Sequence, residues 1–255
     1  MVDTSTENLS GPMTLSDEGP HPRWFVGPVV GAPYAWPYDG SVDTRHLAVV
    51  CIDWQVDFCG PGGYVDRMGY DIGLTRAGLP ATARLLAHAR STGITVIHTR
   101  EGHAPDLGDL PANKRWRSAQ IGAEIGEDGP CGRTLVRGEP GWEIVPEVAP
   151  VPGEYIVDKP GKGAFYATNL DLLLRTNEIT HLVLTGITTD VCVHTTMREA
   201  NDRGYECLIL ADATGATDVA NHTAALRMVT MPGGVFGAVA DTDAVIAATS
   251  RSEDR

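Results

Sequence analysis

After residue 45, short apolar runs alternate with amphipathic segments along most of the chain. The apolar runs are rich in β-branched residues, as expected of strands that are buried on both faces. The predicted strands are Leu47–Ile52, Thr95–Thr99, Tyr155–Val157, Leu182–Thr185, Cys207–Leu210 and, more weakly, Val235–Val239. The predicted helices are Leu79–Ala89, Leu170–Arg175, Val191–Arg203, Thr217–Val229 and Thr242–Ala248. This order predicts an α/β fold: a doubly wound, mostly parallel six-stranded sheet with helices on both faces.

Two segments depart from the alternating pattern. Residues 1–45 are rich in Gly, Pro and acidic residues, which predicts a flexible N-terminal segment and an aromatic arm, followed by one domain at 46–250. The aromatic residues of the arm, expected to pack on the body or on a neighbouring subunit, are Trp24, Phe25, Tyr34, Trp36 and Tyr38. Between Thr99 and Glu154 the helix signals are weak, and a loop of this length predicts an ordered segment that covers the substrate or contacts another subunit.

Charge and composition narrow the range of partners. The chain has 20 Lys and Arg against 33 Asp and Glu, a net charge of −13, so nucleic acid and anionic membranes are not expected as partners. The apolar runs are too short to span a bilayer, and the first 20 residues lack the apolar core of a secretory signal. The 5 cysteines are scattered and odd in number, which favours a reducing, cytoplasmic location in which one cysteine can be chemically active.

Several common site motifs are absent from the sequence. It has no P-loop, no dinucleotide-binding glycine pattern and no serine nucleophile elbow. His98 and His103 follow the second predicted strand, but no further histidine or cysteine pair accompanies them, so a structural or hydrogen-bonding role is favoured over metal ligation. Neither a metal nor an organic cofactor is therefore expected.

Three predicted strands are followed by residues that can work together chemically. Asp53, Lys159 and Cys192 come just after separate strands, and parallel strands bring such residues to one edge of a sheet. Each residue alone has an ordinary structural explanation. Together, Asp53 can take the thiol proton and later protonate a leaving amine, while Lys159 keeps the acid ionised. Cys192 is predicted in the first turn of a helix, where backbone N–H groups favour a thiolate and can bind an oxyanion.

These motifs resemble the isochorismatase-like cysteine hydrolase family, which includes nicotinamidases, N-carbamoylsarcosine amidohydrolases and ureidoacrylate amidohydrolases. The resemblance spans roughly residues 46–248 and implies the triad Asp53, Lys159 and Cys192. It also implies a cis peptide at Ile187–Thr188, an oxyanion hole made by the N–H groups of Thr188 and Cys192, and a homotetramer. The residues implied to contact the substrate are Phe58, Lys162 and Gln55.

Further stretches are more similar to the branch of the family that hydrolyses biuret and triuret. They are residues 36–38, 60–70, 98–103, 110–117, 137–142 and 197–205. The sequence therefore predicts a metal-free cysteine amidohydrolase that cleaves a C–N bond of a small ureido amide of the biuret or triuret class through a thioester-like intermediate, with release of ammonia. Biuret-cleaving relatives carry Gln where this chain has Pro232, so N-carbamoyl amino acids, ureidoacrylate and lactams stay open as substrates, as does a non-catalytic binding module.

Overall fold

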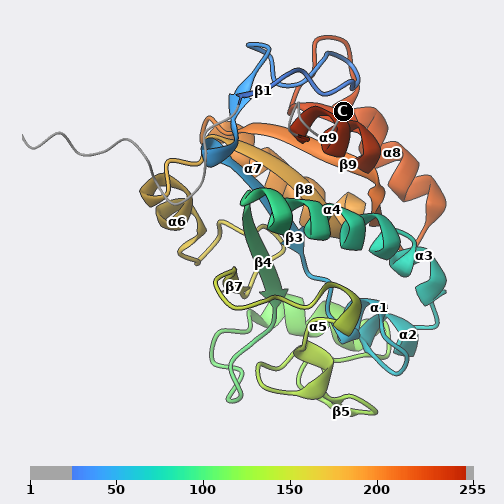
Figure 1. Cartoon of the computed structure of the whole chain (residues 1–255). Coiled ribbons are helices and arrows are strands. Elements are labelled where there is room, and N and C mark those ends of the chain that lie inside the picture. Colours follow the sequence, from blue (N-terminus) through green and yellow to red (C-terminus); the bar gives the residue numbers. More distant parts are fainter. Residues whose placement is uncertain (1–24, 251–255) are drawn as a thin grey trace, which may run out of the picture.

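The computed structural model describes residues 25–250, and a six-stranded sheet forms its centre (Figure 1). The order across the sheet is β10-β9-β8-β3-β4-β7, and every neighbouring pair is parallel. The strands are β3 (Leu47–Ile52), β4 (Thr95–Glu101), β7 (Tyr155–Lys159), β8 (His181–Ile187), β9 (Glu206–Gly215) and β10 (Ala238–Ala240). The predicted α/β sheet is therefore confirmed, with parallel pairing throughout.

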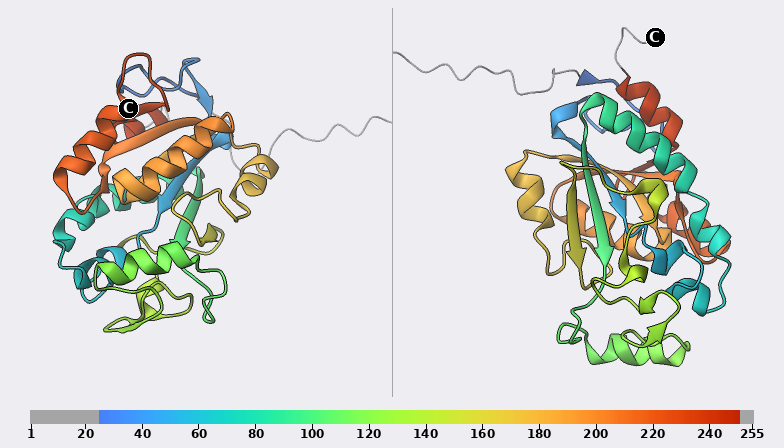
Figure 2. Two further views of the ribbon diagram at one scale, coloured as in Figure 1. Left: turned by 180° about the vertical axis from the view of Figure 1, so that it is seen from behind. Right: turned by 60° about the horizontal axis from the view of Figure 1, so that its bottom comes forward.

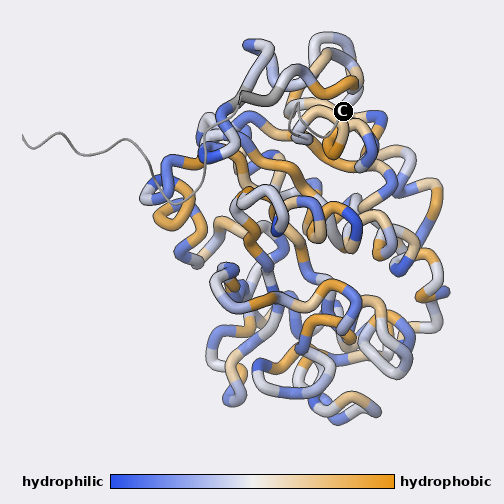
Figure 3. Tube along the Cα trace, in the orientation of Figure 1, coloured by the Kyte–Doolittle hydropathy of each residue, from blue (hydrophilic) through white to orange (hydrophobic). Residues whose placement is uncertain are grey.

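Helices cover both faces of the sheet because each central strand is apolar on both sides. Leu47, Val49 and Cys51 of β3 pack in one core cluster, whereas the residues that alternate with them pack in a second cluster. The first cluster includes residues of α4 (Leu79–Thr92) and α9 (Thr242–Thr249). The second includes residues of α6 (Leu170–Thr176), α7 (His194–Asp202) and α8 (Val219–Val229). Figure 3 shows the apolar residues along the inner elements and the polar ones in the outer loops.

The helix predicted over Val191–Arg203 begins differently from expectation. Its first residues form a π-helical turn, η4 (Thr189–Val193), and the regular helix α7 starts only at His194. The weakly predicted strand Val235–Val239 is also shifted, to Ala238–Ala240. Gly237 has a φ of 132° and directly precedes this strand, so the extended backbone begins after it.

The strand order reverses direction between β3 and β8. From β3 the chain builds outward through β4 and β7, and it then returns to the other side of β3 to build β8, β9 and β10. In open α/β sheets, ligands bind beyond the carboxyl ends of the strands at such a switch point. The residues that follow β3 and β8 are therefore placed where chemistry is expected.

The chain between β4 and β7 forms a cap segment, residues 102–150, beyond the carboxyl end of β4 (Figures 1 and 2). It contains α5 (Ala112–Gln120), a hairpin of β5 (Asp128–Gly129) and β6 (Gly132–Arg133), and the short helices η2 (Pro140–Trp142) and η3 (Pro146–Val148). Three short helices, α1 (Val56–Cys59), α2 (Tyr64–Arg67) and α3 (Ile72–Arg76), follow β3. Helix α5 escaped prediction because Ser118 is its one buried residue, so the helix has no apolar stripe.

The described part of the N-terminal arm lies against the body of the protein. It includes β1 (Phe25–Val26), β2 (Val42–Asp43) and η1 (Thr44–His46). Trp36 is buried and its ring contacts that of His181 edge-on, and Tyr34 donates a hydrogen bond to Glu206, whereas Tyr38 is exposed. Trp24 and the segment predicted to be flexible, up to residue 24, lie outside the described residues. Among residues 25–250, no helix is both long and apolar enough to cross a membrane.

Candidate active site

Asp53 is held at the end of β3 by its backbone and by two side-chain partners. Its φ of 54° lies in the left-handed region, which an Asp tolerates better than most residues and which turns the chain away from the strand direction. Thr99 Oγ1 donates to Asp53 Oδ1 at 2.6 Å, and Lys159 Nζ lies 2.7 Å from Asp53 Oδ2. The carboxylate is completely buried. It is therefore a fixed acid whose charge is balanced by a neighbouring ammonium group.

Lys159 is the last residue of β7 and is equally buried. Its Nζ donates to the backbone carbonyls of Gly161 and Lys162, both at 2.9 Å, in addition to its ion pair with Asp53. These three partners can use all three ammonium protons. The loop after β7 thus fixes the direction in which the lysine points.

Cys192 lies in η4, five residues beyond the end of β8. The peptide bond Ile187–Thr188 between β8 and η4 is cis, at the position that the family resemblance implies. Gly186, just before it, has a φ of 134°, and a Cβ added there would lie 2.2 Å from the carbonyl oxygen of Ile52. Only glycine therefore lets β8 approach β3 this closely, next to the two strand ends that carry the acid and the cysteine.

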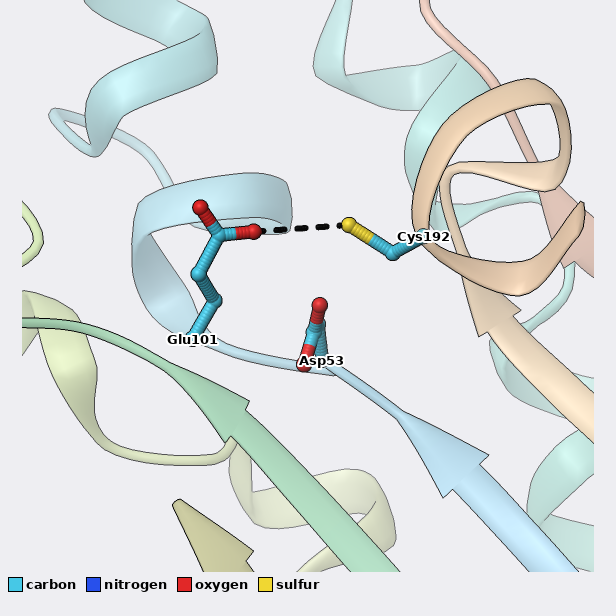
Figure 4. A group of neighbouring side chains, drawn as sticks. All are labelled: Asp53, Glu101 and Cys192. Atoms are coloured by element: carbon cyan, nitrogen blue, oxygen red, sulfur yellow. Dashed lines mark hydrogen bonds between the residues drawn. The ribbon is translucent and has the colours of Figure 1, made fainter. Parts of the chain in front are cut away.

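Glu101 is a fourth member of the site, and the sequence prediction did not name it. It is the last residue of β4 and is completely buried. Its Oε1 accepts from Lys114 Nζ at 2.7 Å and from Lys162 Nζ at 2.9 Å, and its Oε2 lies 3.5 Å from Lys159 Nζ. The Cys192 thiol donates to Oε2 at 3.4 Å, so the carboxylate of Glu101 faces the sulfur directly (Figure 4).

A signal for Glu101 was present in the sequence, but it was weak. The strand was predicted to end at Thr99, whereas β4 continues to Glu101, so the acid occupies the strand end itself. Its role depends on Lys114, which α5 of the cap segment supplies. Since that helix was not predicted, its lysine could not be placed beside the acid.

Burial and the neighbouring charges set the protonation of the cysteine. Burial raises the pKa of the Cys192 thiol well above its ordinary value. Lys159 and Lys162 lower this pKa and the carboxylates of Asp53 and Glu101 raise it, but burial dominates. Burial thus opposes the thiolate that the helix start favours, so the thiol proton has to be removed as the sulfur attacks.

The pKa values of the two acids of the site are shifted in opposite directions. Burial raises the pKa of Asp53, although Lys159 opposes the rise. Burial would also raise the pKa of Glu101, but the three nearby lysines lower it well below the usual range. A carboxylate with a raised pKa is the better base, so Asp53 suits proton transfer and Glu101 suits a permanent charge.

Asp53, Glu101 and Cys192 place their ligand atoms within 4.8 Å of one another, as a metal site would require. Lys159 Nζ, however, contacts both carboxylates, at 2.7 Å and 3.5 Å. The ammonium group thus takes the position at which a bound cation would neutralise the two acids. The donor set fits a lysine-centred ion-pair network better than a metal.

The three residues expected to contact substrate occupy different environments. Lys162 reaches the site through Glu101, and its side chain keeps 42% of its surface exposed. Phe58 is buried, and its ring meets that of Tyr64 edge-on at 6.2 Å. Gln55 does not fit the expectation: it is completely buried, and its amide bonds to the backbone of Glu101 and Trp142. Gln55 therefore joins β4 to the cap segment, and both of its amide N–H groups are used by backbone carbonyls.

His98, His103 and the other four cysteines lie outside the catalytic cluster. His98 Nε2 lies 2.9 Å from Glu154 Oε2, and His103 Nδ1 lies 3.1 Å from Asp109 Oδ1, so each makes the hydrogen bond that was favoured for it. Cys51 and Cys207 are buried in their strands, as predicted. Cys59 ends α1 and is buried, whereas Cys131 is half-buried between β5 and β6.

The fold and the site together define a class. A parallel α/β sheet whose switch point joins an acid, a lysine and a cysteine is the arrangement of an α/β cysteine hydrolase. The isochorismatase domain model matches residues 47–244, and the chain belongs to the isochorismatase family. It is therefore an isochorismatase-family cysteine hydrolase, as the resemblance implied.

Named relatives and solved structures agree with this assignment. A ureidoacrylate amidohydrolase RutB of Methylorubrum extorquens is 33% identical over 230 residues, 87% of this chain and 90% of the relative. A cysteine hydrolase from Pseudomonas syringae is 26% identical with a TM-score of 0.70, over 82% of this chain and 94% of that one. An N-carbamoylsarcosine amidase from Thermoplasma acidophilum, 24% identical with a TM-score of 0.59 over 77% and 96% of the two chains, shares the fold.

Proposed function

We propose that the chain is a cysteine amidohydrolase that cleaves the carbamoyl C–N bond of a small ureido amide of the ureidoacrylate type. The observation that carries the proposal is the contact of a neutral Cys192 thiol with a buried acid and lysine network, at the switch point of a sheet of this family. The biuret and triuret substrates favoured by the sequence have less support, because the relative described above that is 33% identical is named for ureidoacrylate.

The geometry supports a two-step reaction. As the Cys192 sulfur attacks the carbamoyl carbon, its proton passes to Asp53, whose pKa is raised by burial. The negative oxygen that forms is bound by the N–H groups of Thr188 and Cys192 at the start of η4. Asp53 then returns the proton to the leaving amine, the C–N bond breaks, and the carbamoyl group stays on the sulfur.

Hydrolysis completes the cycle. Asp53 takes a proton from water as the oxygen attacks the carbamoyl carbon, the C–S bond breaks, and the thiol regains its proton. The products are the amine and a carbamate, which decomposes to ammonia and carbon dioxide. Lys159 holds Asp53 in place throughout and balances its charge.

The proposal is tested by turnover of 3-ureidoacrylate, N-carbamoylsarcosine, biuret, triuret and a lactam, with ammonia and organic products both measured. Turnover of ureidoacrylate that disappears in Cys192→Ala, together with an acid-trapped peptide carrying one added carbamoyl group on Cys192, is the expected result. Cleavage of biuret in preference to every ureido acid would instead support the substrate class of the biuret and triuret branch. Failure to cleave any of these compounds would refute the proposal.

A further inference from the structure

A pocket of about 630 Å³ opens between α5 and the loop that follows β7. Its size suits a small organic molecule. Lys162 lines it, and Lys162 Nζ is 2.9 Å from Glu101, which in turn accepts the hydrogen bond of the Cys192 thiol. Through Lys162 and Glu101 the pocket is therefore adjacent to the catalytic cluster.

The pocket is positively charged in an acidic protein. Lys114, Arg117 and Lys162 line it, and no Asp or Glu is among its lining residues, although the chain as a whole has 33 acidic against 20 basic residues. A concave site of one charge sign concentrates ligands of the opposite sign. The pocket thus favours an anion over the neutral amides of the biuret type.

The positive charge exceeds what the adjoining acids can balance. Lys114 and Lys162 share a single carboxylate oxygen, Glu101 Oε1, and Lys159 is matched by Asp53. Arg117 is exposed, and its guanidinium forms no salt bridge or hydrogen bond within residues 25–250. With a neutral thiol, four cations face two carboxylates, which leaves two positive charges for a ligand.

The walls of the pocket suit the carbon part of such a ligand. Trp116 and Tyr166 are 63% and 62% exposed, and both line the pocket together with Ile121. Large apolar side chains exposed together and bordered by polar residues are a mark of ligand-binding grooves.

We infer that this pocket binds the carboxylate of an anionic ureido acid, with Arg117 and Lys162 as its cationic partners and the aromatic walls along its carbon chain. The inference rests on the proposed function and adds a specificity determinant to it: the carbamoyl group lies at Cys192 and the acid group lies under α5. The enzyme then distinguishes ureido acids from uncharged ureido amides by their charge.

The test compares 3-ureidopropionate with its neutral primary amide. Binding of both ligands to Cys192→Ala, which cannot turn them over, is measured by isothermal titration calorimetry, alone and combined with Arg117→Gln. The matched control is Arg227→Gln, which removes one positive charge from an exposed position of α8 outside the pocket. A charge-assisted hydrogen bond of ordinary strength predicts that Arg117→Gln weakens binding of the acid about tenfold and lowers the acid-to-amide affinity ratio by the same factor.

The outcomes separate the two proposals. A preference for the acid that falls in Arg117→Gln, weakens with added salt and survives in Arg227→Gln supports the pocket assignment. Equal affinity for acid and amide, or an unchanged ratio in Arg117→Gln, overturns the pocket assignment even when turnover of ureido amides depends on Cys192. Absence of any ureido amide turnover in the wild-type enzyme overturns the proposed function. This result does not depend on the Arg117 variant, so the two failures can be told apart.

Discussion

Glu101→Gln removes one negative charge from the catalytic cluster and preserves the shape of the side chain. The carboxylate is completely buried, and the Cys192 thiol lies 3.4 Å from it. Because Glu101 raises the pKa of this thiol while Lys159 and Lys162 lower it, the substitution removes one of the two carboxylates that oppose the lysines. The variant is therefore expected to have a more acidic cysteine than the wild-type enzyme.

The size of the effect follows from the distance. Two unit charges about 4 Å apart interact by about 4 kcal/mol at an effective dielectric constant near 20, which corresponds to about three pKa units. Movement of the lysines and their hydration will absorb part of this, so we expect the thiol pKa to fall by at least about one unit. The same change leaves Lys114 and Lys162 without their shared partner, and breaking a buried ion pair on one side costs about 3–5 kcal/mol of unfolding free energy. Greater thiol reactivity should thus accompany lower stability and slower turnover.

The assay is the pH dependence of iodoacetamide alkylation at Cys192, followed by peptide mass spectrometry in a Cys131→Ser background. Cys131 is the half-buried thiol, whereas Cys51, Cys59 and Cys207 are buried. Glu127→Gln removes the same charge from an exposed position of the cap segment and serves as the control. If a folded Glu101→Gln protein shows an unchanged or higher thiol pKa, Glu101 does not act on the sulfur and the electrostatic account of the site is refuted.

Three further substitutions test other parts of the structure. Asp53→Asn should lower kcat by about 10²–10⁴, as loss of a general base does, with an unaltered circular dichroism spectrum; substantial residual turnover would assign the base to another residue. Gly186→Ala should lower the unfolding free energy by at least about 1–3 kcal/mol in denaturant titrations, because its Cβ would meet the Ile52 carbonyl, whereas Gly69→Ala, also at positive φ but with no atom within 4 Å of its Cβ, should cost less. Burial raises the pKa of Asp57 to about 6, against an unfolded value of 3.8, so the folded protein binds this proton more tightly and loses stability as the pH rises from about 4 to 6. The unfolding free energy of wild type relative to Asp57→Asn should therefore rise by up to about 3 kcal/mol when the pH falls from 7 to 4, and a flat difference would contradict the assignment.

The fold could be predicted from the sequence wherever burial is periodic. Strands of a parallel sheet are apolar on both faces, so Leu47–Ile52 stood out as an unbroken run, and β3 has those bounds. The helix α4 also starts where predicted, after a glycine and with a proline in its first turn. Helix α5 carries no such pattern because it packs through polar and charged side chains, and the cap segment was accordingly predicted as a loop. Hydrophobic periodicity therefore reports the sheet and its covering helices, and says little about a segment held by ion pairs.

The site residues likewise differ in how far the sequence predicts them. Asp53 directly follows β3, Lys159 ends β7, and Cys192 comes five residues after β8, so the rule that parallel strands end at one edge was enough to bring them together. Gln55 shares a motif with Asp53 but faces the backbone of β4, and sequence proximity gave no way to tell the two side chains apart. The protonation of the thiol could not be predicted from the sequence, because it depends on burial, two lysines and two acids that come from separate parts of the chain. A helix start alone favours a thiolate, but within this cluster the desolvation of the sulfur outweighs the effect of the helix. The negative charge on the sulfur therefore has to be generated during the attack, by transfer of the thiol proton to Asp53.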